Sequence, residues 1–239
     1  MWLISYQLTL GVLFSCCCSF ANVIGMRLVC GRSFLWGRSR CDHCDEVIPW
    51  YALIPILGYL FTRGQCAHCH SPISPYYPLS EWFSLLTGVV WFHHLNNNYC
   101  LWVSFFIILA MAAADYQAQW VPDRLQLALL VCFIAYFYIT GIRFPLTWRL
   151  FDVLLLGSVL LFLATTSKDG IGGADIKLLL LLTSVFGLAA TSLLLLVATT
   201  LALFTALVQY CRPKKQTIIG LPFVPFIACA YPVMLLIMA

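Results

Sequence analysis

Charged side chains are scarce in this sequence. Lysine, arginine, aspartate and glutamate together make up 9% of the 239 residues, whereas soluble domains carry about 25%. Hydrophobic residues make up 62% of the chain, and the mean hydropathy is +0.93. A soluble protein of this size needs a far more polar surface. The composition therefore predicts an all-α protein that crosses a membrane several times.

Other features are also missing. The basic residues form no stripe that alternates with aromatic residues, so the net charge of +4 does not indicate a nucleic-acid partner. We find no low-complexity tail and no internal repeat. The N-terminus lacks the basic start and the A-x-A cleavage site of a secretory signal. Since its apolar run of about 25 residues is long enough to cross a bilayer, we interpret it as a retained first span.

Long apolar segments, each compared with the ~20 residues that a bilayer requires, predict about eight spans: 3–27, 79–95, 99–115, 124–141, 147–166, 175–188, 190–210 and 218–238. All but Arg143 and Arg149 of the 13 lysine and arginine residues fall in loops on one side. The positive-inside rule places that side in the cytoplasm and the N-terminus outside. We expect a first span (1–29), a cytoplasmic loop (30–77) and a membrane core (78–239).

Four cysteines of the 30–77 loop form two C-x-x-C knuckles. CDHC (Cys41, Cys44) and CAHC (Cys66, Cys69) are separated by 21 residues, a spacing typical of a zinc ribbon. The alternative is a pair of disulfides, which a reducing cytoplasm disfavours. Four thiolates leave no coordination position for water, so the zinc would be structural. It would hold together a loop that is too small for a sufficient core of its own.

Several carboxylates at the predicted membrane edges have simple structural explanations. Asp123, in VPDRL, is placed to cap the fourth span. Asp169 lies in a polar turn, where we expect it to be hydrated. Asp152 lies near the outer end of the fifth span, where capping or a local polar contact is expected.

Asp115 and Asp175 are different, because an acid at membrane depth is costly and indicates function. Both fall at cytoplasmic ends of spans, Asp115 after AMAAA and Asp175 after GIGGA. Such small residues let helices approach closely. Two neighbouring carboxyls can share a proton, so that one activates water while the other protonates a leaving group. The alternative is that each acid only caps a helix or lies at a helix interface.

Six segments, taken in order, resemble those of the type IV prepilin peptidases, bacterial membrane aspartyl proteases of pilus, type II secretion and competence systems. They are SFANVIGMRL, the two C-x-x-C knuckles, PISPYYPLSEW, DYQAQWVPD, GGADIKLL and LPFVPFIA. The chain departs from the family pattern at three positions. Tyr76 stands where arginine is usual, and Ala174 and Val224 stand where glycine is usual.

The resemblance implies that Asp115 and Asp175 are the catalytic aspartates. It also implies a location in the bacterial inner membrane and cytoplasmic-side cleavage of prepilin or pseudopilin precursors, which carry a short basic leader before an apolar helix. Many family members also methylate the new N-terminus with S-adenosyl-L-methionine, an activity associated with the cysteine loop. Glu81 matches a glutamate of the family and either orients a substrate amine or anchors the second span.

Two other classes of function remain open from the residues alone. One is a small polytopic transporter with a zinc-stabilised loop, in which the aspartates bind protons or cations near the midplane. The other is a noncatalytic assembly scaffold. The predicted spans place the aspartates at helix ends, which disfavours the transporter.

Overall fold

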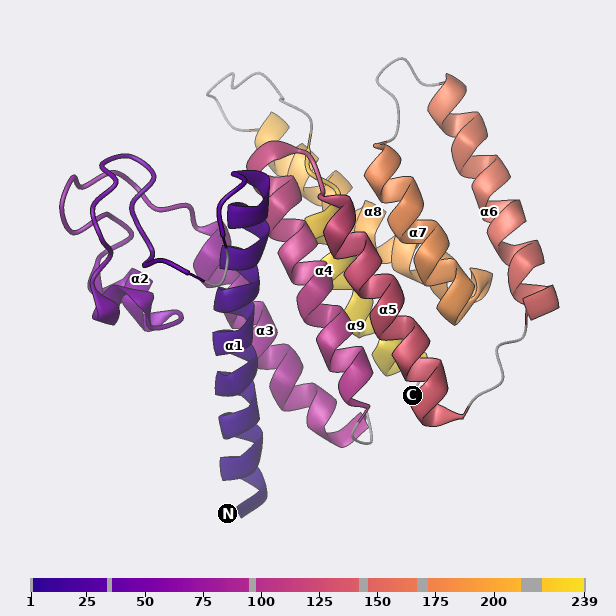
Figure 1. Ribbon diagram of the computed structural model, residues 1–239, viewed down its shortest axis with the longest axis horizontal. Coiled ribbons are helices and arrows are strands. Elements are labelled where there is room, and N and C mark those ends of the chain that lie inside the picture. The colour runs from indigo at the N-terminus through magenta and orange to yellow at the C-terminus, as the bar shows by residue number, and fades with distance from the viewer. Residues whose placement is uncertain are drawn as a thin grey trace. The chain divides into compact units, whose positions relative to one another are not determined.

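A computed structural model describes residues 2–33, 36–94, 98–141, 146–166, 172–211 and 221–238. These residues form helices joined by loops, together with two isolated β-bridges (Figure 1). The all-α fold is therefore confirmed. The helical elements are α1 (Trp2–Val29), η1 (Trp50–Leu53), α2 (Leu57–Phe61), α3 (Tyr76–His94), α4 (Tyr99–Ala118), α5 (Asp123–Thr140), α6 (Leu146–Thr166), α7 (Gly173–Phe186), α8 (Leu188–Tyr210) and α9 (Val224–Met238).

Each of the eight predicted spans overlaps a helix, with α9 beginning at Val224 inside the span predicted at 218–238. Within the described ranges, five helical segments are long and apolar enough to cross a membrane: Ser5–Val29, Tyr99–Ala118, Asp123–Thr140, Trp148–Thr166 and Leu188–Tyr210. The protein is thus a membrane protein, while the count of eight spans stays a prediction. The orientation also stays a prediction, and some of the basic residues on which it depends (Arg143, Lys168, Arg212, Lys214 and Lys215) lie outside the described residues, as does Asp169.

The chain divides into two compact units, Met1–Asn96 and Asn97–Ala239. In the first unit, α1 packs along α3, and two glycines allow the helices to approach closely. A Cβ atom added to Gly88 would lie 2.8 Å from Cγ of Phe14, and one added to Gly11 would lie 2.8 Å from Cγ2 of Val89. Contacts between small residues of this kind are the usual way for membrane helices to associate.

The cysteine loop of the first unit contains a structural repeat. In the first knuckle the Cys41 N–H donates to the Glu46 carbonyl at 3.0 Å, and in the second the Cys66 N–H donates to the Ser71 carbonyl at 2.9 Å. The residue after each C-x-x-C has a left-handed backbone, with φ of 55° and 57°. The two knuckles therefore share one backbone conformation. In the sequence, the likeness of the two knuckles is limited to the shared pattern C-x-H-C.

In the second unit, α4 contacts α5 and α9, α8 contacts α9, and α6 contacts α7. The run 110–114 of α4 is almost completely buried, because its alanines leave room for neighbouring helices. Deeper in the unit, the hydroxyls of Ser104 and Tyr231 lie 2.6 Å apart and join α4 to α9. The C-terminal end of α4 and the first turns of α5 and α7 lie at the same end of the unit (Figure 1).

Asp152, on α6, contacts the chain where α7 ends and α8 begins. Oδ2 of Asp152 accepts a hydrogen bond from the Leu188 N–H at 3.2 Å and thus caps the start of α8. The expected local polar role of Asp152 is confirmed. This contact lies about 20 Å along α7 from its first turn, since an α-helix rises 1.5 Å per residue.

Candidate functional site

Asp115 lies in the last turn of α4 and is 8% exposed. Its Oδ2 accepts a hydrogen bond from the Val224 N–H at 3.0 Å. Val224 begins α9, and the first N–H groups of a helix have no partner within the helix. The carboxylate therefore closes the N-terminus of α9 while α9 fixes the orientation of the carboxylate.

Asp175 lies in the first turn of α7, immediately beside the residue that precedes the helix. Gly172 is that N-cap residue, with φ of −56°. A Cβ atom added to Gly172 would lie 3.1 Å from Oδ2 of Asp175 and 3.6 Å from its Cγ. Gly173 differs, since a Cβ atom there would meet nothing within 4 Å. The absent side chain at position 172 therefore provides the space that the Asp175 carboxylate occupies.

The start of α5 positions the start of α7. Nε2 of Gln126 donates to the Ala174 carbonyl at 3.1 Å, and Nζ of Lys177 lies 2.8 Å from Oδ1 of Asp123. The expected capping role of Asp123 is wrong, because Pro122 is the N-cap residue of α5 and no side chain caps this helix. The carboxylate of Asp123 pairs with a lysine of another helix instead, a contact that local sequence does not reveal.

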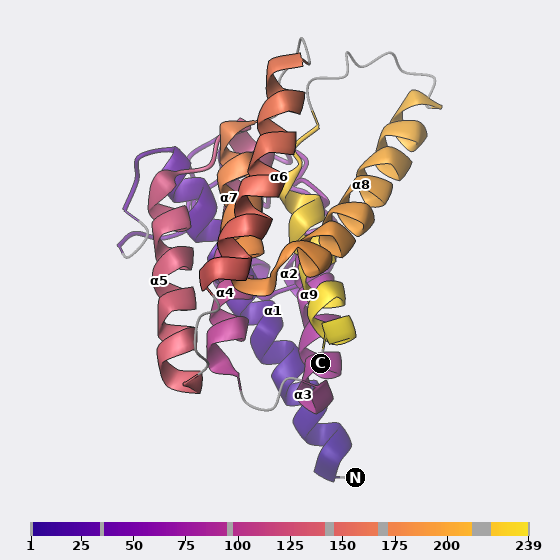
Figure 2. The same cartoon turned by 90° about the vertical axis from the view of Figure 1, so that its right-hand side faces the viewer.

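The two candidate acids belong to the same end of the second unit. The carboxylates of Asp115 and Asp175 lie close enough for the charge of one to act on the other, although 59 intervening residues separate them in the sequence. Figure 2 shows α7 and α9 descending from this end, α7 beside α6. Two carboxyls within electrostatic range, one of them almost buried, are candidates for acid–base chemistry. Both acids were found from sequence, whereas the Val224 contact was not.

Glu81 occupies a different environment, in the first unit. It is 8% exposed on α3, and its Oε2 accepts the Ile56 N–H at 2.7 Å. Ile56 precedes α2 and has a positive φ of 64°. The side chain of Ser19, on α1, also contacts the carboxylate. These contacts favour the anchoring role for Glu81, because they use its carboxylate to connect α3 and α1 to the cysteine loop.

The four predicted metal ligands, Cys41, Cys44, Cys66 and Cys69, meet at one point. Their Sγ atoms all lie within 4.8 Å of one another, and those of Cys41 and Cys69 are 3.8 Å apart. This distance is far longer than a disulfide of about 2.05 Å. It agrees with the edge of a tetrahedron whose metal–sulfur distance is about 2.3 Å, for which the edge is about 3.8 Å. The cluster can therefore hold a metal ion.

Hydrogen bonds favour the thiolate, the form that binds a metal, at two of the four cysteines. Backbone hydrogen bonds from Cys44 and His43 lower the pKa of the Cys41 thiol to about 6. A hydrogen bond from the Ser71 side chain lowers the pKa of the Cys69 thiol. At Cys44 a backbone hydrogen bond from Glu46 is outweighed by desolvation and by hydrogen bonds with the other three cysteines, which raise the pKa of its thiol to about 12. Among the described residues, the group consists of the four cysteines without a histidine. The fit of the cluster to a metal therefore rests on sulfur ligands alone.

Comparison with known proteins identifies the family. Two family models match the chain, one described as "Bacterial Peptidase A24 N-terminal domain" over residues 12–95 and the other as "Type IV leader peptidase family" over residues 102–207. A "Prepilin leader peptidase/N-methyltransferase" of Stutzerimonas stutzeri is 32% identical over 80% of this chain and 69% of its own length. The chain belongs to the type IV leader peptidase family.

Other proteins similar to this chain carry the same name. The protein of Klebsiella pneumoniae is 32% identical over 75% of this chain and 85% of its own length. That of Burkholderia pseudomallei (strain 1026b) is 31% identical over 80% of this chain, and the chain spans 64% of its length. No solved structure matches the chain.

Proposed function

We propose that this protein is a membrane-embedded aspartyl endopeptidase that removes the leader peptide of type IV prepilin-like precursors, prepilins or pseudopilins, on the cytoplasmic side of the inner membrane. The proposal is supported by the placement of Asp115 at the end of α4 and Asp175 at the start of α7, at the same end of the second unit and within electrostatic range of each other. The printed names of the relatives support the choice of substrate.

In this mechanism, a water molecule lies between Asp115 and Asp175. The ionised carboxylate takes a proton from the water as its oxygen adds to the carbonyl carbon of the scissile bond. The protonated partner gives its proton to the developing oxyanion. The tetrahedral intermediate then collapses and the C–N bond breaks. The amine leaves with a proton from the first carboxyl, while the second carboxylate takes back a proton from a hydroxyl of the intermediate. Val224 contributes by holding Oδ2 of Asp115 in place.

The turn before Asp175 is open to solvent, since Gly172, the N-cap residue of α7, is exposed. A substrate of the proposed class carries an apolar helix immediately after its cleavage site, so its scissile bond lies at the membrane surface. Acids at helix ends suit that bond, whereas a transporter of the competing kind would need them near the midplane.

The cysteine cluster would hold zinc as a structural ion. The donor set of four thiolates is the set that structural zinc prefers, and it leaves no coordination position for substrate. When bound, the ion would supply cross-linking of the two knuckles rather than catalysis. Cys41, Cys44, Cys66 and Cys69 would be its ligands.

Methylation of the new N-terminus is a weaker proposal that rests on the printed names of the relatives. Glu81, the residue that we associate with a substrate amine or methyl transfer, does not fit a site for S-adenosyl-L-methionine. Its Oε2 already accepts the Ile56 N–H, and the side chain is almost buried. We therefore derive no step through this cofactor.

The experiment that tests the proposal is cleavage of a prepilin-like precursor by the purified protein in liposomes, with the product mapped by mass spectrometry. We expect cleavage by the wild type and none by Asp115→Asn. Asp152→Asn is the matched control, because an asparagine side-chain oxygen can still accept the Leu188 N–H at the far end of α7. If a panel of precursors remains uncut by the wild type, or if Asp115→Asn cuts at the wild-type rate, the transporter or scaffold class replaces the peptidase.

A further inference from the structure

Large apolar side chains are exposed on the cysteine loop, outside the apolar transmembrane helices. They lie in residues 50–61, WYALIPILGYLF, which comprise η1 and α2 and which we call the loop apolar segment. Trp50 is 77% exposed, Leu60 62% and Phe61 63%. A monomeric soluble surface rarely gathers such residues without a partner to cover them.

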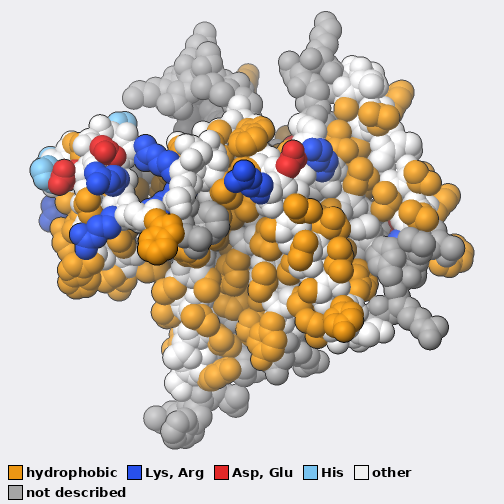
Figure 3. Space-filling model, in the orientation of Figure 1, with side chains coloured by type: hydrophobic (Ala, Val, Ile, Leu, Met, Phe, Trp, Pro, Cys, Tyr) orange, Lys and Arg blue, Asp and Glu red, His pale blue; other side chains and the backbone are white. Residues whose placement is uncertain are grey.

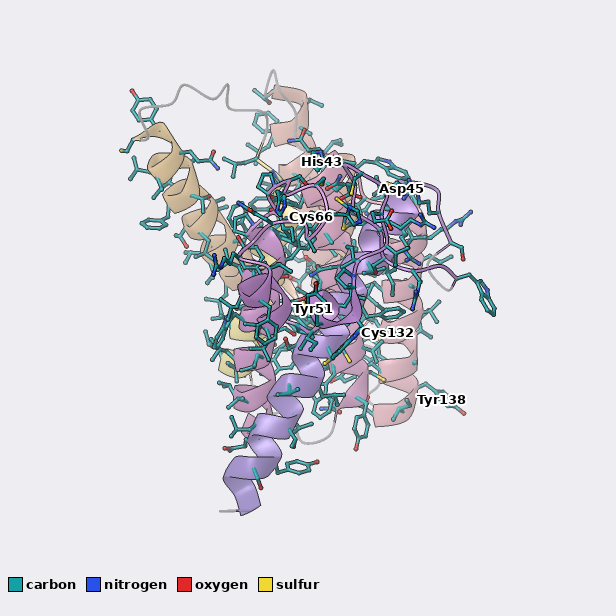
Figure 4. All side chains as sticks on the ribbon, turned by 90° about the vertical axis from the view of Figure 1, so that its left-hand side faces the viewer. His43, Asp45, Tyr51, Cys66, Cys132 and Tyr138 are labelled. Carbon is teal, nitrogen blue, oxygen red and sulfur yellow. The ribbon has the colours of Figure 1, made fainter. Side chains whose placement is uncertain are left out.

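The apolar residues lie on one side of the loop, away from its acidic and histidine side chains. Figure 3 shows the acidic and histidine side chains on the upper side of the loop, hydrophobic side chains on its lower side, and arginine side chains from the upper side down to the middle. Figure 4 shows the same division, with Tyr51 well below His43, Asp45 and Cys66 along the direction in which α1 runs. The apolar side of the loop therefore lies toward the transmembrane part of α1, and the charged side lies away from it.

A buried hydrogen bond fixes the height of the loop apolar segment. Ile56 lies at the centre of the segment and donates its N–H to Oε2 of Glu81, at 2.7 Å. Glu81 is in the second turn of α3, so the segment is held beside the start of a predicted membrane span. This contact prevents the segment from moving far from that level without breaking a buried hydrogen bond.

Apolar side chains are also exposed on α3. Leu79 is 66% exposed, Trp82 50% and Leu86 55%, at a spacing that places them along one face of the helix. This face of α3 is the one that lipid covers if α3 spans the membrane. The loop apolar segment is therefore attached to a helix whose own exposed face is apolar from its first turns.

The composition of the segment and its flanks matches the chemistry of the membrane surface. Trp50 and Tyr51 are aromatic residues with a polar group, the type that is enriched where a bilayer meets water. Arg38 and Arg63, on either side of the segment, are exposed. Basic side chains at this level attract the anionic headgroups of the cytoplasmic leaflet.

We infer that the loop apolar segment is an interfacial membrane anchor, with Trp50, Leu60 and Phe61 inserted at the boundary between headgroups and acyl chains of the bilayer that the protein spans. The partner is phospholipid. Such anchors typically bury their apolar face about 5–10 Å into that boundary. The anchor holds the cysteine cluster at a fixed height, with His43 and Asp45 on the aqueous side.

The test is photo-crosslinking of the full chain in lipid nanodiscs. The amino acid p-benzoyl-phenylalanine is placed at Leu60 in one sample and at His43, an exposed position on the charged side of the same loop, in the control. The nanodiscs contain an alkyne-tagged phospholipid. We expect several times more lipid adduct at Leu60 than at His43. Equal adduct at the two positions, or protein adduct in place of lipid at Leu60, overturns the inference.

A second measurement avoids the unnatural residue. Wild-type protein and Trp50→Phe are placed in vesicles with and without lipids brominated on the acyl chains, which quench tryptophan at short range. We expect the wild type to lose more fluorescence to bromine than Trp50→Phe, the difference being the contribution of Trp50. Identical quenching of the two proteins contradicts insertion. Because Trp50 is mostly exposed, the substitution leaves the packing of the loop unchanged.

Discussion

The space at Gly172 allows a sharp test of how the site is built. Alanine at this position would place its Cβ 3.1 Å from Oδ2 of Asp175, closer than carbon and oxygen normally approach, so the carboxylate must move by a few tenths of an ångström. The backbone itself tolerates alanine, because φ is −56° and ψ is 128° at Gly172, a region that every residue type can adopt. The change therefore displaces a proposed catalytic group without straining the fold.

A misplacement of 1 Å in a catalytic geometry costs about a hundredfold in rate. For the smaller displacement at Asp175 we expect about a tenfold fall in kcat/KM for Gly172→Ala, which corresponds to about 1.4 kcal/mol. The matched control is Gly173→Ala, because its Cβ would meet nothing within 4 Å. The assay is the cleavage rate of a precursor in liposomes, with thermal unfolding of each variant measured in detergent. Equal rates for the two variants would refute the geometry.

Three further predictions concern stability and metal binding. Cys44→Ser should abolish the binding of zinc by the purified protein, as measured by elemental analysis, while circular dichroism still shows the membrane helices; full zinc content would contradict the four-sulfur site. Gly88→Ala should destabilise the α1–α3 pair by about 1–3 kcal/mol through overpacking. The control is Gly157→Ala, whose Cβ would lie 3.4 Å from one leucine methyl group and which should be neutral or stabilising. Thermal unfolding of the two variants compares them. Asp123→Asn should change stability by less than about 1 kcal/mol, because the side chains of Asp123 and Lys177 are 79% and 62% exposed; a larger loss in the same assay would contradict this.

The helices could be located from sequence because hydropathy over some 20 residues depends on local composition alone. The boundary between the predicted spans 175–188 and 190–210 falls at Gly187, between α7 and α8. Glycine ends the first helix there with φ of 87°, a conformation that other residues rarely adopt. By contrast, η1 and α2 could not be found in this way, because segments of four and five residues are too short for a span-length pattern.

The candidate site could be predicted in part. Asp115 and Asp175 were identifiable because acids are expensive beside apolar runs. The partner of Asp115 was not identifiable, since Val224 lies 109 residues away and contributes a backbone N–H that every residue type but proline possesses. Asp123 shows the opposite error: its position beside a proline indicated a cap, but a lysine from α7 pairs with its carboxylate. Contacts between distant helices depend on packing that local sequence does not record.

The most direct test of the central proposal is whether Asp115 and Asp175 act as one unit. Asp115→Asn, Asp175→Asn and the double variant are compared with the wild type for single-turnover cleavage of a precursor in liposomes. Residues that share one chemical step give non-additive losses. We therefore expect each single variant to lose at least about a hundredfold in rate and the double variant to be no slower than either. An active Asp175→Asn enzyme, or losses that multiply in the double variant, would contradict a shared catalytic centre.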